Sequence, residues 1–223
     1  MSQKHLLVIA PHPDDEILGA GGTMAKYAKL GFGITVLTVA GHRPPLYTEE
    51  VYLQTVREAK AAHGLIGVER SIFLDVPATM VGDLKSHELN GMIKSTVDEV
   101  RPTIVMVPYP DRHVDHRIIF DSALVATRPV QVGTEIEILA AYETLSETHW
   151  NAPHIEPNFT PNWVCNITDY IDRKIDALRC FESQIPAFPG ARSIEALKAL
   201  SIFRGTQAGF SYGEAFHILR MCT

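Results

Sequence analysis

The stretch His5-Leu-Leu-Val-Ile-Ala-Pro-His-Pro-Asp-Asp-Glu16 decides the fold, because in it a short apolar run ends abruptly in prolines and acids. Residues 5–10 do not alternate strictly between apolar and polar, which is typical of a strand covered on both faces. Two prolines restrict the backbone directly after this run, and a helical stretch follows over residues 16–30. The sequence therefore predicts a buried strand, then a rigid turn with one imidazole and adjacent carboxylates, then a helix.

The same alternation of strand and helix continues through the first two thirds of the chain. Further strands and helices are predicted, in chain order, over residues 34–40, 51–66, 71–76, 86–100, 103–108 and 116–128. Elements that alternate at this spacing indicate a Rossmann-like α/β fold, doubly wound, with a mostly parallel sheet and helices on both faces.

The pattern changes after about residue 130. Strands are predicted over residues 135–143 and 163–168, and helices over 169–184 and 193–204. The apolar run 215–219 fits either a strand or a helix. Because no internal repeat and no clear linker is present, we expect one domain over residues 1–223 with a C-terminal elaboration.

Composition excludes several classes of protein. Lys and Arg number 20 and Asp and Glu number 26, which gives a formal net charge of −6 over 223 residues. A generic nucleic-acid or anionic-membrane binder usually carries the opposite charge. The chain has no run of the ~20 apolar residues that a membrane span requires. Its three cysteines are far apart and form no CxxC pair, so we expect a cytoplasmic protein.

A second polar motif, Tyr109-Pro-Asp-Arg-His-Val-Asp-His116, directly follows the predicted strand at 103–108. Ligands of open α/β sheets bind outside the carboxyl ends of the strands, where the strand order reverses. If the strand order begins 3-2-1-4, the first and fourth strands are neighbours at that reversal. The motif after residue 10 and the motif after residue 108 then face each other across one crevice.

These two motifs together supply the ligands of a catalytic metal. His12, Asp15 and His116 provide two imidazoles and one carboxylate, the usual set for a zinc ion that keeps one position open for water. Such a water loses a proton near neutral pH. Fe2+ is the alternative metal, because the same set occurs in iron enzymes.

Three further side chains in the motifs suit hydrolysis of an amide or ester. Asp14 is next to a predicted ligand and can accept the proton of the water as general base. As an imidazolium, His113 can stabilise an oxyanion or protonate a leaving amine. Asp115 can hydrogen-bond a ring nitrogen of His113 and fix its orientation. In isolation, an aspartate at the start of a helix is more simply a cap, but capping explains only one of these acids.

Three other interpretations fit less well. Gly19-Ala-Gly21-Gly22 suggests a dinucleotide-binding oxidoreductase, but that motif requires a small residue where Met24 stands, so we assign no cofactor-binding glycines. An iron oxygenase does not need the extra acid at Asp14 or the extra histidine at His113. A binding protein without catalysis would have no use for Asp14 beside a metal.

The residues quoted above resemble a known family. Pro11 to Glu16 and His113-Val-Asp-His116 are similar to the two motifs of the PIG-L/LmbE-like zinc-dependent deacetylases of N-acetylglucosaminyl substrates, with Val114 where a proline is frequent. The segments 142–143, 181–184 and 212–216 extend the similarity over most of the chain. The resemblance implies a Rossmann-like fold, often an oligomer, and these roles: His12, Asp15 and His116 as ligands, Asp14 as base, and His113 as electrostatic partner or acid.

We therefore expect a hydrolase of linear amides that removes an N-acetyl group from an amino sugar or glycoconjugate. The alternative is a metal-dependent amidase or deformylase that acts on a non-acetyl amide of a small metabolite. Arg57 resembles the arginine of a family helix and is a candidate substrate contact. The loop 41–50 and the stretch 145–162 are expected to form the pocket walls, and a homo-oligomer without nucleic-acid partners is expected.

Overall fold

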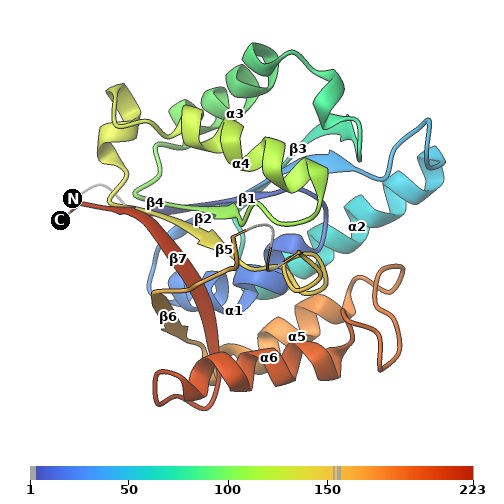
Figure 1. Ribbon diagram of the computed structural model, residues 1–223, viewed down its shortest axis with the longest axis vertical. Coiled ribbons are helices and arrows are strands. Elements are labelled where there is room, and N and C mark those ends of the chain that lie inside the picture. The colour runs from blue at the N-terminus through green and yellow to red at the C-terminus, as the bar shows by residue number, and fades with distance from the viewer. Residues whose placement is uncertain (1–3, 153, 155–156, 223) are drawn as a thin grey trace.

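A computed structural model describes residues 4–152, 154 and 157–222 and shows one seven-stranded sheet (Figure 1). The strand order is β3-β2-β1-β4-β5-β7-β6. Strands β1 to β5 pair in parallel, and β7 pairs antiparallel with both β5 and β6. The strands are β1 His5–Ala10, β2 Gly33–Gly41, β3 Arg70–Pro77, β4 Ile104–Pro108, β5 Ile138–Tyr142, β6 Trp163–Asn166 and β7 Gly213–Met221.

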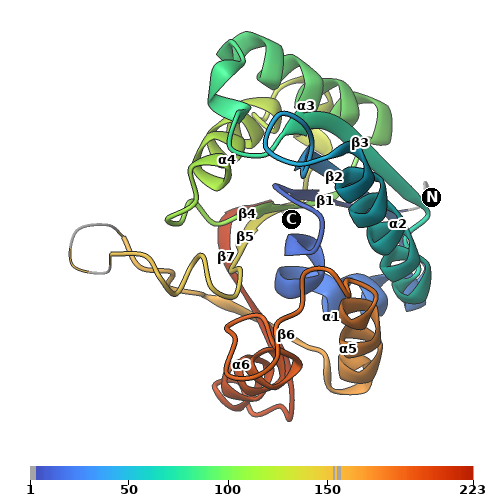
Figure 2. The same ribbon diagram turned by 90° about the vertical axis from the view of Figure 1, so that its right-hand side faces the viewer.

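Helices cover both faces of the sheet. In Figures 1 and 2, α3 and α4 lie on one face, and α1, α2, α5 and α6 lie on the other. No described helix has the length and apolar character needed to cross a membrane. The helices are α1 Asp15–Lys29, α2 Glu49–Ile66, α3 Ser86–Val100, α4 Val114–Ala126, α5 Ile171–Arg179 and α6 Ile194–Thr206, with short 3-10 turns at Val81–Asp83, Gln131–Glu135 and Thr168–Tyr170.

Strand β1 is buried on both faces, as its sequence predicts. Leu6 and Val8 pack into the core beneath α1, α2 and α5, and Leu7 and Ile9 pack into the core beneath α3 and α4. All four side chains have zero exposed surface. Burial of such a side chain stabilises a protein by about 1.5–3 kcal/mol, so β1 fixes the centre of the fold.

The doubly wound α/β fold predicted from the sequence is confirmed. The order β3-β2-β1-β4 makes β1 and β4 neighbours, and their carboxyl ends meet where the strand order reverses. The run 215–219, which fitted either strand or helix, belongs to β7. It pairs with β5 because the connection through α6 brings the chain back along the edge of the parallel sheet.

The glycines of α1 serve close packing between helix and sheet. A Cβ atom on Gly19 would lie 2.1 Å from the ring of Tyr142, and one on Gly22 would lie 2.8 Å from Ile167. Both distances are shorter than any real contact, so these positions accept only glycine. This packing agrees with the sequence interpretation that the glycines are not a phosphate loop.

Candidate active site

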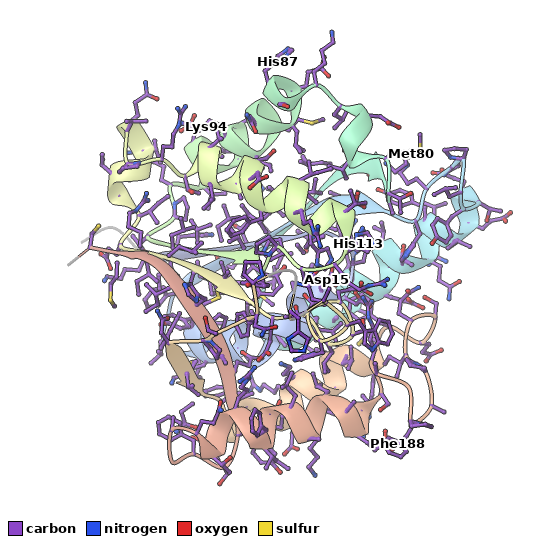
Figure 3. The ribbon with its side chains drawn as sticks, in the orientation of Figure 1. Asp15, Met80, His87, Lys94, His113 and Phe188 are labelled. Carbon is purple, nitrogen blue, oxygen red and sulfur yellow. The ribbon has the colours of Figure 1, made fainter. Side chains whose placement is uncertain are left out.

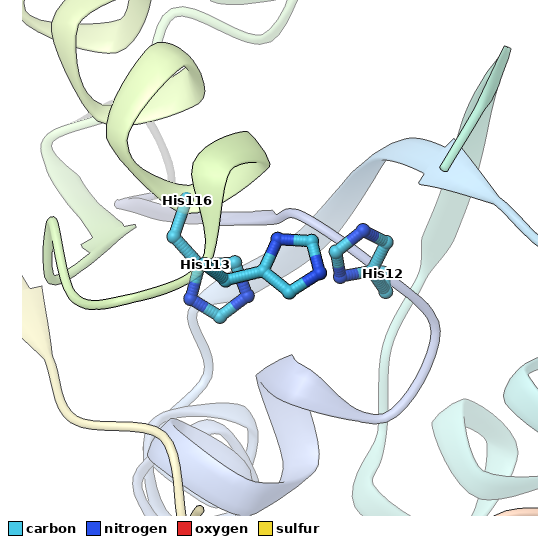
Figure 4. Close-up of side chains that lie close together, drawn as sticks. All are labelled: His12, His113 and His116. Atoms are coloured by element: carbon cyan, nitrogen blue, oxygen red, sulfur yellow. The ribbon is translucent and has the colours of Figure 1, made fainter. Parts of the chain in front are cut away.

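The two polar motifs meet at the carboxyl ends of β1 and β4. His12 comes from the turn between β1 and α1, and His113 and His116 come from the start of α4 (Figure 4). The ring centroid of His113 lies 4.7 Å from that of His12 and 5.0 Å from that of His116. One ring nitrogen from each of the three lies within 4.8 Å of the others, so this group could hold a metal ion.

The carboxylate of Asp15 lies between two of these imidazoles, near His113 in Figure 3. Its Oδ2 is 3.2 Å from Nδ1 of His12 and 3.3 Å from Nε2 of His116. Neighbouring ligands of one tetrahedral zinc, with bonds of about 2.0–2.1 Å, are about 3.3–3.4 Å apart. Burial would raise the pKa of the Asp15 carboxyl, but the adjacent His116 holds it well below its usual range. This carboxylate is therefore ionised, as a metal ligand must be.

Two buried polar atoms of this cluster have no hydrogen-bond partner among the described residues. They are Oδ1 of Asp15 and Nε2 of His116, and both residues are completely buried. An unpaired buried polar atom costs about 1–3 kcal/mol, and a bound cation would satisfy both of these. The donor set therefore fits a metal ion.

His12 and His116 are each hydrogen-bonded, through one ring nitrogen, by a carboxylate of their own. Asp115 Oδ2 lies 2.9 Å from Nε2 of His12, and Asp111 Oδ2 lies 3.1 Å from Nδ1 of His116. Metal-binding histidines usually donate their second ring N–H to such a carboxylate, which fixes the ring and its tautomer. The sequence interpretation that the Asp115 carboxylate holds His113 is wrong, because this carboxylate turns toward His12 and the backbone N–H of Thr79.

His113 differs from the other two histidines in its hydrogen bonding. It is the N-cap of α4, and its Nδ1 accepts the backbone N–H of Asp115 at 3.2 Å. Burial and the nearby imidazoles of His12 and His116 lower the pKa of His113. The sequence prediction of an imidazolium at His113 is therefore wrong, because the lowered pKa favours the neutral ring, and the hydrogen bond accepted by Nδ1 places the proton of that ring on Nε2.

Asp14 has the most strained backbone at the site. Its φ of 108° is a backbone conformation that residues other than glycine rarely adopt and that costs about 1–3 kcal/mol. It occupies the N-cap position of α1, yet its side chain makes no capping hydrogen bond within the described part of the chain. Its Oδ2 instead lies 2.9 Å from Nη1 of Arg192. Burial raises the pKa of Asp14 to about 7, although Arg192 opposes the rise.

Asp14, His12 and His113 line a chamber of about 120 Å³. The predicted wall segments contribute Tyr47 from the loop 41–50 and Glu147 from the stretch 145–162, although residues 153, 155 and 156 of that stretch lie outside the described residues. Burial, and then the charge of His12, lower the pKa of His42 to about 4. The chamber is lined by His12, Asp14, His42, Tyr47, Ala78, Thr79, His113, Glu147 and Arg192.

The structure does not bring Arg57 to this chamber. Arg57 is exposed on α2, whereas Arg192 enters from the loop between α5 and α6 and lies 3.6 Å from Glu147. Sequence reasoning missed Arg192 and Asp111. Asp111 stands inside the second polar motif, so its position was a signal, but nothing around Arg192 in the sequence resembles a motif.

Together, the fold and the site define an α/β protein with a histidine–carboxylate cluster at the topological switch point of a doubly wound sheet. The sequence profile of the PIG-L family, described as GlcNAc-PI de-N-acetylase, matches residues 7–127. That match covers more than half of the chain and both polar motifs. The chain belongs to the PIG-L family.

Individual relatives resemble the chain over nearly its full length. The diacetylchitobiose deacetylase of Thermococcus kodakarensis is 25% identical over 97% of this chain and 83% of its own. The crystal structure of the conserved protein TT1542 from Thermus thermophilus is 26% identical, with a TM-score of 0.78, covering 99% of this chain and 97% of the other. GalB, a 4-carboxy-2-hydroxymuconate hydratase from Pseudomonas putida, also has a TM-score of 0.78 at 19% identity, covering 99% and 98% of the two chains. The fold alone therefore does not decide the reaction.

Proposed function

We propose that this protein is a metal-dependent hydrolase that removes an N-acetyl group from an amino sugar or glycoconjugate. One observation carries the proposal: His12 and His116 each hydrogen-bond a carboxylate of their own and both contact Asp15, and the carboxyl of Asp14, which is paired with Arg192, lies next to them. Family membership and the deacetylase activity named for the Thermococcus relative agree with this chemistry.

His12, Asp15 and His116 would hold the metal, His12 through Nδ1, Asp15 through its carboxylate and His116 through Nε2. His113 is a less suitable ligand, because its Nδ1 accepts the backbone N–H of Asp115 and its Nε2 therefore carries the proton. We propose zinc, with Fe2+ as the alternative. When bound, the metal supplies a water of pKa near 7 and polarises the acyl carbonyl.

Asp14 is the proposed general base. Its Oδ2 is held by Arg192 and its Oδ1 has no hydrogen-bond partner in the described part of the chain. Oδ1 can accept a proton from the water as oxygen attacks the amide carbon. The same carboxyl then returns that proton to the amide nitrogen, the carbon–nitrogen bond breaks, and acetic acid and an amine result, which exchange a proton to give acetate and an ammonium ion.

His113 is the proposed oxyanion donor. The Nε2–H of a neutral His113 can donate to the carbonyl oxygen as negative charge develops there. The N-cap hydrogen bond at Nδ1 fixes both the tautomer and the direction of this donor. Asp115 is a positioning residue, because its carboxylate orients the His12 ring and does not contact the substrate.

The size of the chamber bears on the acyl group. A volume of about 120 Å³ suits a small acyl group, such as acetyl or formyl. The alternative activity, a deformylase or amidase that acts on a small metabolite, would use the same catalytic residues. Amine release from matched N-acetyl and N-formyl glucosamines separates these two activities. A faster rate with the acetyl compound supports the proposal, and a faster rate with the formyl compound favours the alternative.

The setting of the enzyme is also part of the proposal. We propose that residues 1–223 form one PIG-L/LmbE-like domain that works in the cytoplasm as a homo-oligomer. The free thiols of Cys165, Cys180 and Cys222 agree with a reducing compartment. Arg57 remains a predicted substrate contact, although it is exposed on α2 and is not among the residues that line the chamber.

The deciding experiment measures metal content together with amine release from N-acetylglucosamine conjugates, before and after chelation. About one equivalent of zinc or iron with chelator-sensitive release is the expected result. Failure to bind metal after repletion at neutral pH would overturn the proposal.

A further inference from the structure

The strained backbone of Asp14 is held by a side chain outside the metal cluster. The backbone N–H of Asp14 donates to Glu16 Oε2 at 3.2 Å. Glu16 has zero exposed surface. A backbone at φ 108° persists only where its surroundings fix it, and this hydrogen bond is such a restraint.

Glu16 is itself held by a buried histidine from another helix. His63, in the last turn of α2, is 2% exposed, and its Nε2 lies 3.1 Å from Glu16 Oε1. An ionised carboxylate only accepts hydrogen bonds, so Nε2 of His63 must be the donor. Nδ1 of His63 lies 2.7 Å from the hydroxyl oxygen of Ser71 on β3, which fixes the ring from its other side.

We propose that His63 is a positioning residue for catalysis. It fixes Glu16, Glu16 fixes the amide of Asp14, and Asp14 thereby keeps its carboxylate directed into the chamber beside Arg192. His63 is not among the described residues that line the chamber, and its hydrogen bonds go to Glu16 and Ser71. The proposal rests on the role of Asp14 as general base given above.

A purely structural role explains only part of this arrangement. An acid in the first turn of a helix interacts favourably with the helix dipole, which accounts for Glu16 near the start of α1. The dipole does not require a buried histidine from α2. One Glu16 oxygen accepts from His63 and the other from Asp14, so the carboxylate connects the two.

Two amide substitutions separate positioning from simple packing. In His63→Gln the side-chain nitrogen can stand where Nε2 stood and still donate to Glu16. In His63→Asn the nitrogen stands near the position of Nδ1 and cannot reach Glu16. Thr55→Val is the control, because it removes a buried hydroxyl group from the same helix. Among the described contacts, this hydroxyl hydrogen-bonds only the backbone oxygen of Tyr52 within α2.

The measurements are hydrogen exchange of the Asp14 amide by NMR, metal content, and kcat and KM with an N-acetylglucosamine conjugate. For His63→Asn we expect exchange of this amide to accelerate by about tenfold or more. We also expect kcat to fall about tenfold or more with KM within about twofold of wild type and metal content unchanged. His63→Gln should restore both kcat and slow exchange, and Thr55→Val should leave both unchanged.

Equal behaviour of His63→Gln and His63→Asn would overturn the proposal, as would loss of metal in His63→Asn. A failure of the proposed function looks different, because wild-type protein would then release no amine from acetylated substrates. The exchange rate of the Asp14 amide decides in that case whether His63 positions Asp14, since it does not depend on turnover.

Discussion

Arg192 Nη1 lies 2.9 Å from Oδ2 of Asp14, across 178 residues of sequence. The same guanidinium lies 3.8 Å from Asp15 and 3.6 Å from Glu147, and its Nε donates to the hydroxyl of Ser146 at 3.0 Å. Arg192 thus interacts with three carboxylates at the site, those of Asp14, Asp15 and Glu147. The C-terminal third of the chain, which lies outside the profile match at residues 7–127, therefore completes the site.

Replacing this cation is expected to impair turnover. Arg192→Ala leaves the carboxylate of Asp14 without its partner and three acids close together, so we expect kcat/KM to fall by about 10–100-fold. Steady-state amine release measures this change. Arg173→Ala, which removes an exposed arginine of α5, is the control and should have no effect. Equal rates for Arg192→Ala and wild type would remove Arg192 from the site.

Asp14→Asn tests the general base. The amide is close in shape to the carboxylate but cannot accept the proton of the water, so kcat should fall by about 10²–10⁴-fold. Elemental analysis should find metal content near that of wild type. Loss of the metal would instead make Asp14 a ligand.

Asp111→Asn tests the carboxylate behind His116. The substitution weakens the hydrogen bond to Nδ1 of His116, so we expect metal affinity to fall by about 10–100-fold. Competition with a chromogenic chelator measures this affinity. Asp121→Asn changes the same charge at an exposed position of α4 and should leave the affinity unchanged.

His116→Ala removes the ligand itself and should abolish metal binding, and unaltered binding in that variant would contradict the ligand set.

His113→Ala tests the oxyanion donor. Without the Nε2–H group, kcat should fall more than KM rises, because the donor acts mainly on charge that develops in the transition state. Metal content should not change, since the proposed ligand set does not include His113. His113→Gln retains a side-chain donor and should recover part of kcat. An unchanged kcat in the alanine variant would end the catalytic role.

The sequence predicted the strands of the parallel sheet from short-range patterns and, from their order, the meeting of the two motifs, whereas the run 215–219 of β7 fitted either a strand or a helix. An apolar run without alternation, such as residues 5–10, predicts a strand that is buried on both faces, and β1 is such a strand. The carboxyl ends of parallel strands then share one edge of the sheet, so His12 and His116 could be placed together without coordinates.

The rest of the site depends on tertiary packing that no local pattern encodes. Asp111 and Asp115 stand four residues apart around the start of α4, and only the orientation of the helix decides that one holds His116 and the other His12. Arg192 lines the chamber and lies in the loop that connects α5 and α6, which pack on the same face of the sheet as α1 (Figure 2).

A buried ion pair beside the site gives a prediction about stability and pH. Glu143 is 4% exposed and accepts hydrogen bonds from Arg204 at 2.7 and 2.6 Å and from His149 at 3.2 Å. Burial would raise the pKa of Glu143, but the bonds from His149 and Arg204 outweigh it and lower the pKa. A carboxyl with a lowered folded-state pKa stabilises the protein fully above its unfolded pKa of about 4.3, and this contribution is lost as pH falls through the folded value.

Arg204→Met should therefore reduce the free energy of unfolding at pH 7 by about 3–5 kcal/mol, because it leaves the buried Glu143 without its main partner. Urea denaturation at several pH values measures the difference from wild type, which should shrink as pH is lowered from 7 to below about 4. Arg179→Met is the matched control, because Arg179 pairs with Asp176 at an exposed position and its loss should have little effect. A difference between Arg204→Met and wild type that does not change with pH would show that packing, rather than the charge of Glu143, accounts for the loss.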